Sequence, residues 1–168
     1  MMKRFALLAC VLALAACNQT SAPAEDMVDP DTRAGQEALA ELVDSYLDDA
    51  VTQLAPLGQP AVGLNDQMAL IAVNESPNNW NVPLMAGTNY VFVGRCDNEC
   101  TNLDIEILDP AGAVVASDVL DDNYPIARVT PSAAGNYTIR THLRVCTVEP
   151  CQIGVRALTE PTSGATAP

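Results

Sequence analysis

Residues 88–112, T-N-Y-V-F-V-G-R-C-D-N-E-C-T-N-L-D-I-E-I-L-D-P-A-G, are the stretch that decides the fold. Aromatic and valine residues alternate over Tyr90–Val93, and apolar and acidic residues alternate strictly over Leu103–Ile107, as on a half-buried β-strand. Asp109–Gly112 has Pro at its second position and Gly at its fourth, which a type I turn prefers. The stretch therefore predicts two strands on either side of a cysteine-closed loop, followed by a turn.

Short strands with turn signals between them recur on both sides of this stretch. The further strands that we expect are 68–73, 114–115, 126–130, 137–145 and 153–157. We expect a loop over 74–82, which holds the only Trp, and an acidic loop over 118–123. The pattern predicts a mainly β domain over residues 64–159, an antiparallel β-sandwich or jelly roll of about seven or eight strands.

Four segments of this region resemble the bacterial pre-peptidase C-terminal domain family. They are Ala86–Tyr90, Leu103–Ile105, Leu108–Gly112 and Ala134–Ile139. Domains of that family accompany secreted proteases or stand alone as binding modules, and we expect no protease before this one. The resemblance therefore implies a β-sandwich that serves as a binding module.

One amphipathic helix is expected before the sandwich, over residues 31–57, with Asp31 or Thr32 as its cap and Pro56 and Gly58 ending it. Its apolar residues form one continuous stripe: Leu39, Leu42, Val43, Tyr46, Leu47, Ala50, Val51 and Leu54. Two interpretations are open. The stripe packs on the β-domain, or it docks a partner or a second copy of the chain, because a sandwich has a two-layer core of its own.

The N-terminus predicts export and lipid anchoring. Lys3 and Arg4 precede an apolar run, Phe5–Ala16, that is too short for a stable membrane span. The motif Leu14-Ala15-Ala16-Cys17 resembles the lipobox of bacterial lipoproteins, which implies a signal peptide over residues 1–16 and a lipidated Cys17; the alternative is an ordinary cleaved signal. Asn18 in place of Asp favours the outer membrane, with the body facing the periplasm or the cell surface.

Polar segments flank the folded part. Residues 17–30 are expected to form a flexible tether, and residues 160–168 a disordered tail. Cleavage before Cys17 would leave six Arg, no Lys and 21 acidic residues, a net charge of −15. Such a surface repels nucleic acid and anionic lipid. We expect the membrane contact to be made through the N-terminal lipid, and an envelope protein or glycan as the partner.

Four cysteines remain after Cys10 and Cys17 are set aside. In an oxidising compartment an even number predicts disulfides. We favour the local pairs Cys96–Cys100 and Cys146–Cys151, because each would close a short loop. Crossed pairing and a zinc site with C-x3-C and C-x4-C spacing are the alternatives.

Two oxygen-rich loops raise the hypothesis of a Ca²⁺ site, because this ion takes six to eight oxygen ligands. The loops are Asp97–Glu99 with Asp104, and Asp118–Asn123. The candidate ligands are Asp97, Asp104, Asp118, Asp121 and Asp122. Solvated acidic loops without a metal are the alternative, and no other cofactor is expected.

No constellation of side chains indicates catalysis, so we expect a protein that is not an enzyme. His142, the only histidine, lies on the outward row of its strand, and no serine lies in a nucleophile elbow. Arg128, Arg140, Arg144 and Arg156 share the outward parity of their strands. They form either cross-strand pairs with Asp104 and Glu106 or a patch for an anionic partner.

The function expected from these features is that of a non-enzymatic envelope lipoprotein whose β-sandwich acts as a binding or assembly module. The alternative is an accessory subunit or inhibitor of an envelope enzyme, docked through the helix stripe.

Overall fold

The computed structural model describes residues 29–53 and 58–160. This described part forms one long helix, α1 (Arg33–Gln53), and then strands with a short 3-10 helix, η2 (Val73–Glu75), among them. The strands are β1 (Gln59–Pro60), β2 (Gln67–Ile71), β3 (Asn78–Leu84), β4 (Tyr90–Cys96), β5 (Cys100–Leu108), β6 (Val114–Asp118), β7 (Ile126–Val129), β8 (Gly135–Cys146) and β9 (Cys151–Thr159).

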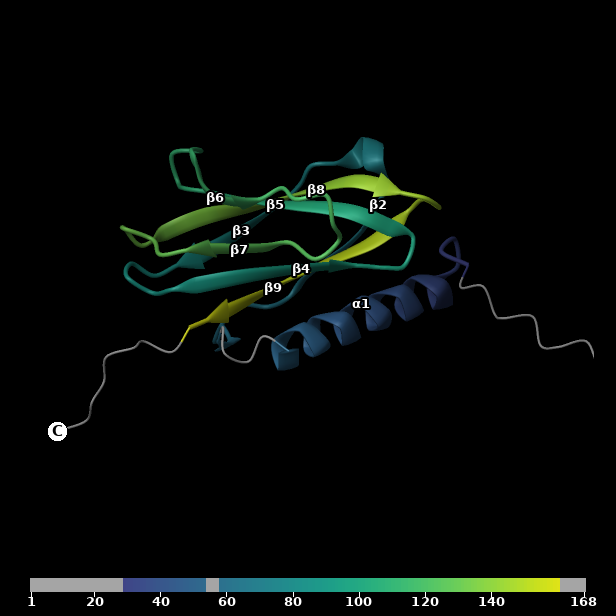
Figure 1. Ribbon diagram of the computed structural model, residues 1–168, viewed down its shortest axis with the longest axis horizontal. Helices are drawn as coiled ribbons and strands as arrows, with labels where there is room; N and C mark the ends of the chain where they lie inside the picture. Colours follow the sequence, from purple (N-terminus) through teal and green to yellow (C-terminus); the bar gives the residue numbers. More distant parts are fainter. Residues whose placement is uncertain (1–28, 54–57, 161–168) are drawn as a thin grey trace, which may run out of the picture.

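The strands make two antiparallel sheets. Sheet A has the order β1-β9-β4-β7, and β2 also pairs with β9. Sheet B has the order β3-β8-β5-β6. Figure 1 shows the two sheets as stacked layers, with α1 alongside β4 and β9 of sheet A on the side away from sheet B. The predicted antiparallel β-sandwich preceded by one helix is therefore confirmed.

The main core lies between the sheets. Phe92 and Val155 enter it from sheet A, and Ile105, Ile107 and Ile139 enter it from sheet B, and all of these side chains are buried. Burial of aliphatic and aromatic surface on this scale is the dominant stabilising contribution. The alternating sequence of β5 follows from this arrangement, since its apolar residues point into the core and its acidic residues point away from it.

Strands β4 and β9 of sheet A are buried on both faces, because α1 covers their outer face. Val91, Val93 and Leu158 point away from sheet B and pack with Ala50 of the helix. At Gly154 of β9, a β-carbon would lie 2.8 Å from Val43 Cγ1 and 3.1 Å from Leu47 Cδ1. The missing side chain therefore lets the helix lie close against the sheet.

The structure decides between the two interpretations of the helix stripe. Leu39, Val43 and Leu47 are buried within the chain, with 8%, 0% and 0% of their surface exposed, whereas Leu42, Tyr46 and Val51 are partly buried. The prediction that this stripe docks a partner is wrong for the three buried residues. The reason is that a strand apolar at both parities, as β4 is, needs a cover on each face.

The helix begins where the sequence indicated. Thr32 Oγ1 accepts a hydrogen bond of 3.0 Å from the backbone N–H of Gly35, which makes Thr32 the cap. The described helix ends at Gln53. Residues 54–57 of the expected helix, with Leu54 of the stripe, lie outside the described residues.

One prediction about the strands is wrong. The segment expected as a loop over 74–82 contains most of β3, which pairs with β8 in a register that sets Trp80 opposite Ile139. Trp80, Val82 and Leu84 point into the sandwich, while Asn79 and Asn81 point out. The asparagines disguised the period-2 pattern, because Asn is depleted in strands. Strand β1 also extends sheet A ahead of residue 64.

Both disulfides form with the predicted local pairing, Cys96–Cys100 and Cys146–Cys151. The first closes the turn from sheet A to sheet B between β4 and β5. The second closes the turn back, between β8 and β9. Crossed pairing and the zinc site are excluded by these bonds. The two bridges therefore tie the layers together at one end of the sandwich.

Candidate functional site: a pocket between the helix and sheet A

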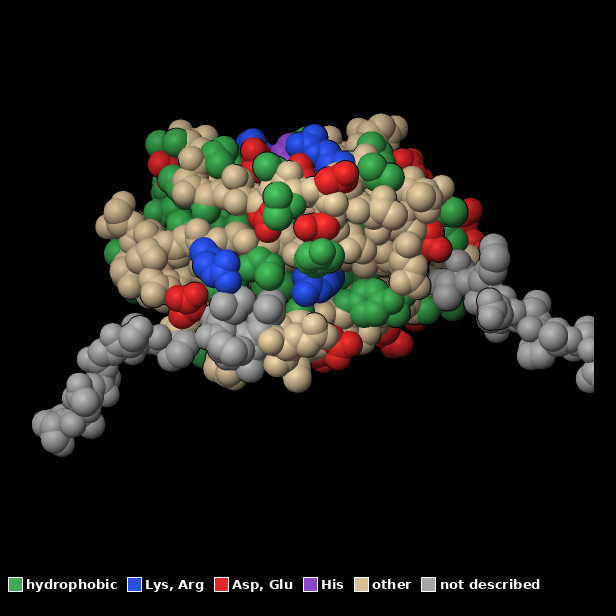
Figure 2. Space-filling view, viewed as in Figure 1, with side chains coloured by type: hydrophobic (Ala, Val, Ile, Leu, Met, Phe, Trp, Pro, Cys, Tyr) green, Lys and Arg blue, Asp and Glu red, His purple; other side chains and the backbone are tan. Residues whose placement is uncertain are grey.

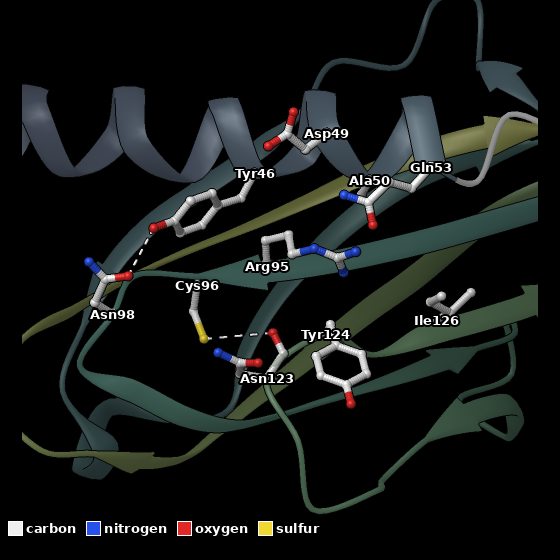
Figure 3. A pocket seen from close by; sticks show the side chains of 10 residues that line it. All are labelled: Tyr46, Asp49, Ala50, Gln53, Arg95, Cys96, Asn98, Asn123, Tyr124 and Ile126. Atoms are coloured by element: carbon white, nitrogen blue, oxygen red, sulfur yellow. Dashed lines mark hydrogen bonds between the residues drawn. The ribbon is translucent and has the colours of Figure 1, made fainter.

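A pocket of roughly 570 Å³ opens between α1 and the end of sheet A. Its lining residues come from α1, from the end of β4 and the loop after it, and from the start of β7 and the loop before it (Figure 3). They are Tyr46, Asp49, Ala50, Gln53, Arg95, Cys96, Asn98, Asn123, Tyr124 and Ile126. A volume of this size falls in the range of small-molecule sites, about 300–1,000 Å³.

Arg95 is placed in this pocket by the parity of β4. Val91 and Val93 point outward and are covered by α1, and Arg95 is the next outward residue along the strand. It is partly buried, and its Nη1 donates a hydrogen bond of 2.6 Å to the carbonyl of Gly94. Its guanidinium carbon lies 6.0 Å from the centroid of the Tyr124 ring, within the range of a cation–π contact.

Burial lowers the pKa of Arg95, and the negative charge of Asp122 partly opposes that shift. A guanidinium nevertheless stays protonated in proteins, so the pocket holds a full positive charge. Partial removal of that charge from water costs free energy unless a counter-ion compensates it. Arg95 is thus a cation whose environment favours an added anion.

The other arginines of the described chain have such partners, and Arg95 has none. Each of the others contacts at least one carboxylate: Arg33, Arg128, Arg140, Arg144 and Arg156. Within residues 29–53 and 58–160, no carboxylate contacts Arg95. The pocket therefore contains the one arginine that the described part of the protein leaves without an ion pair.

Amide side chains surround the arginine. The Tyr46 hydroxyl donates a hydrogen bond of 2.8 Å to Asn98 Oδ1, which leaves the Asn98 amide nitrogen as a donor for a ligand. Asn123 Nδ2 donates to the carbonyl of Cys100 at 3.2 Å. The Cys96–Cys100 disulfide closes the loop that carries Asn98. The polar groups of the pocket are therefore held by the fold before any ligand arrives.

The helix that forms one side of the pocket is fixed to sheet A by Arg156. Its side chain is only 11% exposed and donates to three carboxylates: to Asp44 at 2.9 Å, to Asp48 at 2.6 Å and to Asp66 at 2.6 Å. The hydrogen bond to Asp66 contributes most to raising the pKa of Arg156, burial opposes it, and the hydrogen bond to Asp48 adds to it. Because Asp44 and Asp48 belong to α1, this cluster sets the position of the helix over the sheet.

The sequence-predicted arginine patch does not form. Arg140 Nη1 lies 3.4 Å from Glu106 Oε2, and Arg144 Nε lies 2.6 Å from Asp104 Oδ2, so the predicted cross-strand pairs on sheet B are confirmed. Arg128 and Arg156 belong to sheet A and pair elsewhere. Figure 2 shows basic side chains separated by acidic and neutral ones on the displayed face.

His142 is a member of the same polar face of sheet B. Its Nε2 lies 3.1 Å from Glu106 Oε2, and its side chain is 17% exposed, less than its outward parity suggested. The hydrogen bond from His142, more than any other contact, lowers the pKa of Glu106, while burial opposes the shift. His142 therefore belongs to a hydrogen-bonded network with Glu106 and Arg140.

The candidate Ca²⁺ ligands are not brought together. Asp97 is buried and accepts a backbone N–H at 2.6 Å, and burial raises its pKa. Asp104 is bound by an arginine, Asp118 and Asp122 accept backbone N–H groups, and Asp121 accepts an asparagine amide at 2.6 Å. Among the described residues, no three His, Cys, Asp or Glu side chains are grouped to hold a metal ion. Binding of Ca²⁺ by these residues therefore stays a prediction.

The predicted anchor lies outside the residues that the structure describes. The signal segment 1–16, Cys17, residues 18–28 of the tether and residues 161–168 of the tail all lie outside the described residues. In the part of the chain that is described, α1 is not apolar enough to cross a bilayer. Lipidation of Cys17 therefore stays a prediction.

Comparison with known proteins gives no family. No protein-family model matches this chain, and no curated protein does. Among solved structures, a chain of the Glycosylation Associate Protein (Gap123) complex from Streptococcus agalactiae is similar at 19% identity, with a TM-score of 0.32. The match covers 62% of this chain and 34% of that one. A likeness of this degree carries no argument about function.

Proposed function

We propose that this chain is a non-enzymatic, lipid-anchored envelope protein whose β-sandwich binds a small ligand carrying a carboxylate or a similar anionic group. The binding site is the pocket between α1 and sheet A. The observation that carries the proposal is Arg95, a partly buried guanidinium that contacts no carboxylate among the described residues. Arginine is the residue best suited to bind a carboxylate, because its planar fork donates two parallel hydrogen bonds.

The other pocket residues fit this role. Tyr124 and Ile126 give apolar surface beside the charge, and the amides of Asn98 and Asn123 give directed polar contacts. This mixture of apolar walls and few fixed polar groups is typical of binding sites. Docking of an envelope enzyme through the helix stripe is not proposed, because the central residues of the stripe are buried against sheet A.

The proposal is tested by the melting temperature of the full chain in detergent with a panel of small monocarboxylic acids and their uncharged amides. A ligand that binds only the folded state at 100 times its Kd stabilises that state by about 2.7 kcal/mol. We expect one or more acids, but not the matched amides, to raise the melting temperature. The shift should be lost in Arg95→Gln and kept in the control Arg128→Gln, which removes an arginine that does not line the pocket. Equal shifts with acid and amide, or an undiminished shift in Arg95→Gln, would contradict the proposal.

A further inference from the structure

A second charge lines the pocket on the side opposite Arg95. Asp49 is carried by α1, and Figure 3 shows it on the helix side, with Arg95 on the sheet side. Within the described residues no hydrogen bond or ion pair engages the Asp49 carboxylate, and it does not contact Arg95. The pocket therefore presents a cation and an anion that do not neutralise each other.

The overall charge of the protein limits which ligand benefits from this arrangement. After Cys17 the sequence has six Arg and 21 acidic residues, so its net charge is strongly negative. The negative charge of Asp122 also acts electrostatically on Arg95. A simple anion is repelled by such a surface as it approaches. A zwitterion has no net charge and is spared that repulsion, while each of its ends meets an opposite charge in the pocket.

The surface between the two charges suits a peptide. Tyr46, Ala50, Tyr124 and Ile126 supply apolar contact area. The Asn98 amide nitrogen, left free by the Tyr46 hydrogen bond to Asn98 Oδ1, is a donor for a peptide carbonyl. The volume of roughly 570 Å³ exceeds what a single ion needs. A chain of two or three residues would use this space more fully.

We propose that the ligand is zwitterionic, an amino acid or short peptide with both termini free, whose carboxylate binds Arg95 and whose ammonium group binds Asp49. This inference rests on the proposed function, because it assigns the chemistry of the same pocket. Each charge-assisted hydrogen bond that is lost should weaken binding about ten- to a hundredfold.

The test compares three probes by titration calorimetry with the full chain in detergent. Leucyl-leucine keeps both charges, N-acetyl-leucyl-leucine keeps only the carboxylate, and leucyl-leucinamide keeps only the amine. Leucyl-leucine should bind at least about tenfold more tightly than either of the other two. The order between the two blocked peptides reports which charge contributes more.

Variants locate the two contacts. Asp49→Asn should weaken leucyl-leucine to the level of the acetylated peptide and leave the acetylated peptide unaffected. The matched control is Glu41→Gln, which removes an exposed acidic charge from the same helix outside the pocket and should leave all three affinities unchanged. Arg95→Gln should weaken leucyl-leucine and the acetylated peptide alike, with Arg128→Gln as its control.

Each outcome separates this inference from the proposed function. If the acetylated peptide binds as tightly as leucyl-leucine, the amine is not recognised, and the zwitterion inference is wrong while carboxylate binding stands. Equal losses in Asp49→Asn and Glu41→Gln would show a long-range charge effect and also overturn the inference. If no probe binds and no carboxylic acid of the panel binds either, the pocket is not a ligand site and both proposals are wrong.

Discussion

Replacing Arg156 with Gln should destabilise the fold more than replacement of any other described arginine. Its guanidinium donates to Asp44, Asp48 and Asp66 with distances of 2.6–3.0 Å. Removal of one member of a fully buried ion pair costs about 3–5 kcal/mol, since it leaves an uncompensated charge. Three carboxylates would then face one another without a cation.

The exposure of the partners reduces that magnitude. Arg156 is only 11% exposed, but the Asp44 and Asp48 side chains are 52% and 70% exposed and can recover hydrogen bonds to water. Asp66 is 30% exposed and recovers fewer. We therefore expect Arg156→Gln to lower the free energy of unfolding by about 2–3 kcal/mol. Most of this lost stability should reflect weaker attachment of α1 to sheet A.

The assay is equilibrium unfolding in urea, followed by far-ultraviolet circular dichroism, together with native-state hydrogen exchange. The exchange of α1 amides should accelerate in Arg156→Gln more than that of sheet B. The control is Arg33→Gln, whose ion pair with Glu37 is 92% and 63% exposed and should contribute under about 1 kcal/mol. A stability for Arg156→Gln within about 0.5 kcal/mol of wild type, or unchanged exchange in α1, would refute the view that this cluster holds the helix.

Three further predictions follow from other parts of the chain. Gly154→Ala should lower the free energy of unfolding by about 1–3 kcal/mol in a urea titration, because its β-carbon would meet Met68 Sδ at 2.7 Å and Val43 Cγ1 at 2.8 Å; a neutral effect would mean that the helix lies further from the sheet. Because the pKa of Glu106 is lowered in the folded protein, its ionised carboxylate stabilises the fold above the ordinary pKa of 4.5, and this stabilisation is lost as the pH falls through the lower folded pKa. The loss of unfolding free energy in Glu106→Gln should therefore be largest at neutral pH and should disappear at acid pH. A deficit that does not change with pH would contradict this linkage. Cys17→Ser should move the protein out of the membrane fraction or block its processing, and normal cleavage with unchanged membrane partitioning would refute lipidation at this residue.

The sequence predicted the fold best for strands that have one polar face. Apolar and acidic residues alternate strictly over Leu103–Ile107, and they form the inward and outward rows of β5. The loop-closing cysteine pairs were also readable, because each pair is separated by only a few residues. The prediction of a loop before Pro83 was wrong, since Asn79 and Asn81 occupy the outward row of β3 and the apolar residues of its inward row there are only Trp80 and Val82.

The candidate site was not readable in the same way. The stripe on α1 and the doubly apolar strand β4 were both visible, but nothing local to either one indicates that they cover each other. Arg95 was not singled out from the sequence. The arginines that were singled out are Arg128, Arg140, Arg144 and Arg156, which the fold pairs with carboxylates. The signal available in the sequence was an arginine close behind Tyr90–Val93, a run that is apolar at both parities.

The most direct test of carboxylate binding at Arg95 is a nuclear magnetic resonance titration of the arginine side-chain Nε–H signals with leucyl-leucine. The described arginines give a built-in comparison, because all except Arg95 already contact carboxylates of the protein. We predict a saturable shift of the Arg95 signal, assigned by its loss in Arg95→Gln, while the signals of Arg128 and Arg144 stay in place. Saturation without a shift at Arg95, or with the largest shift at another arginine, would contradict the account.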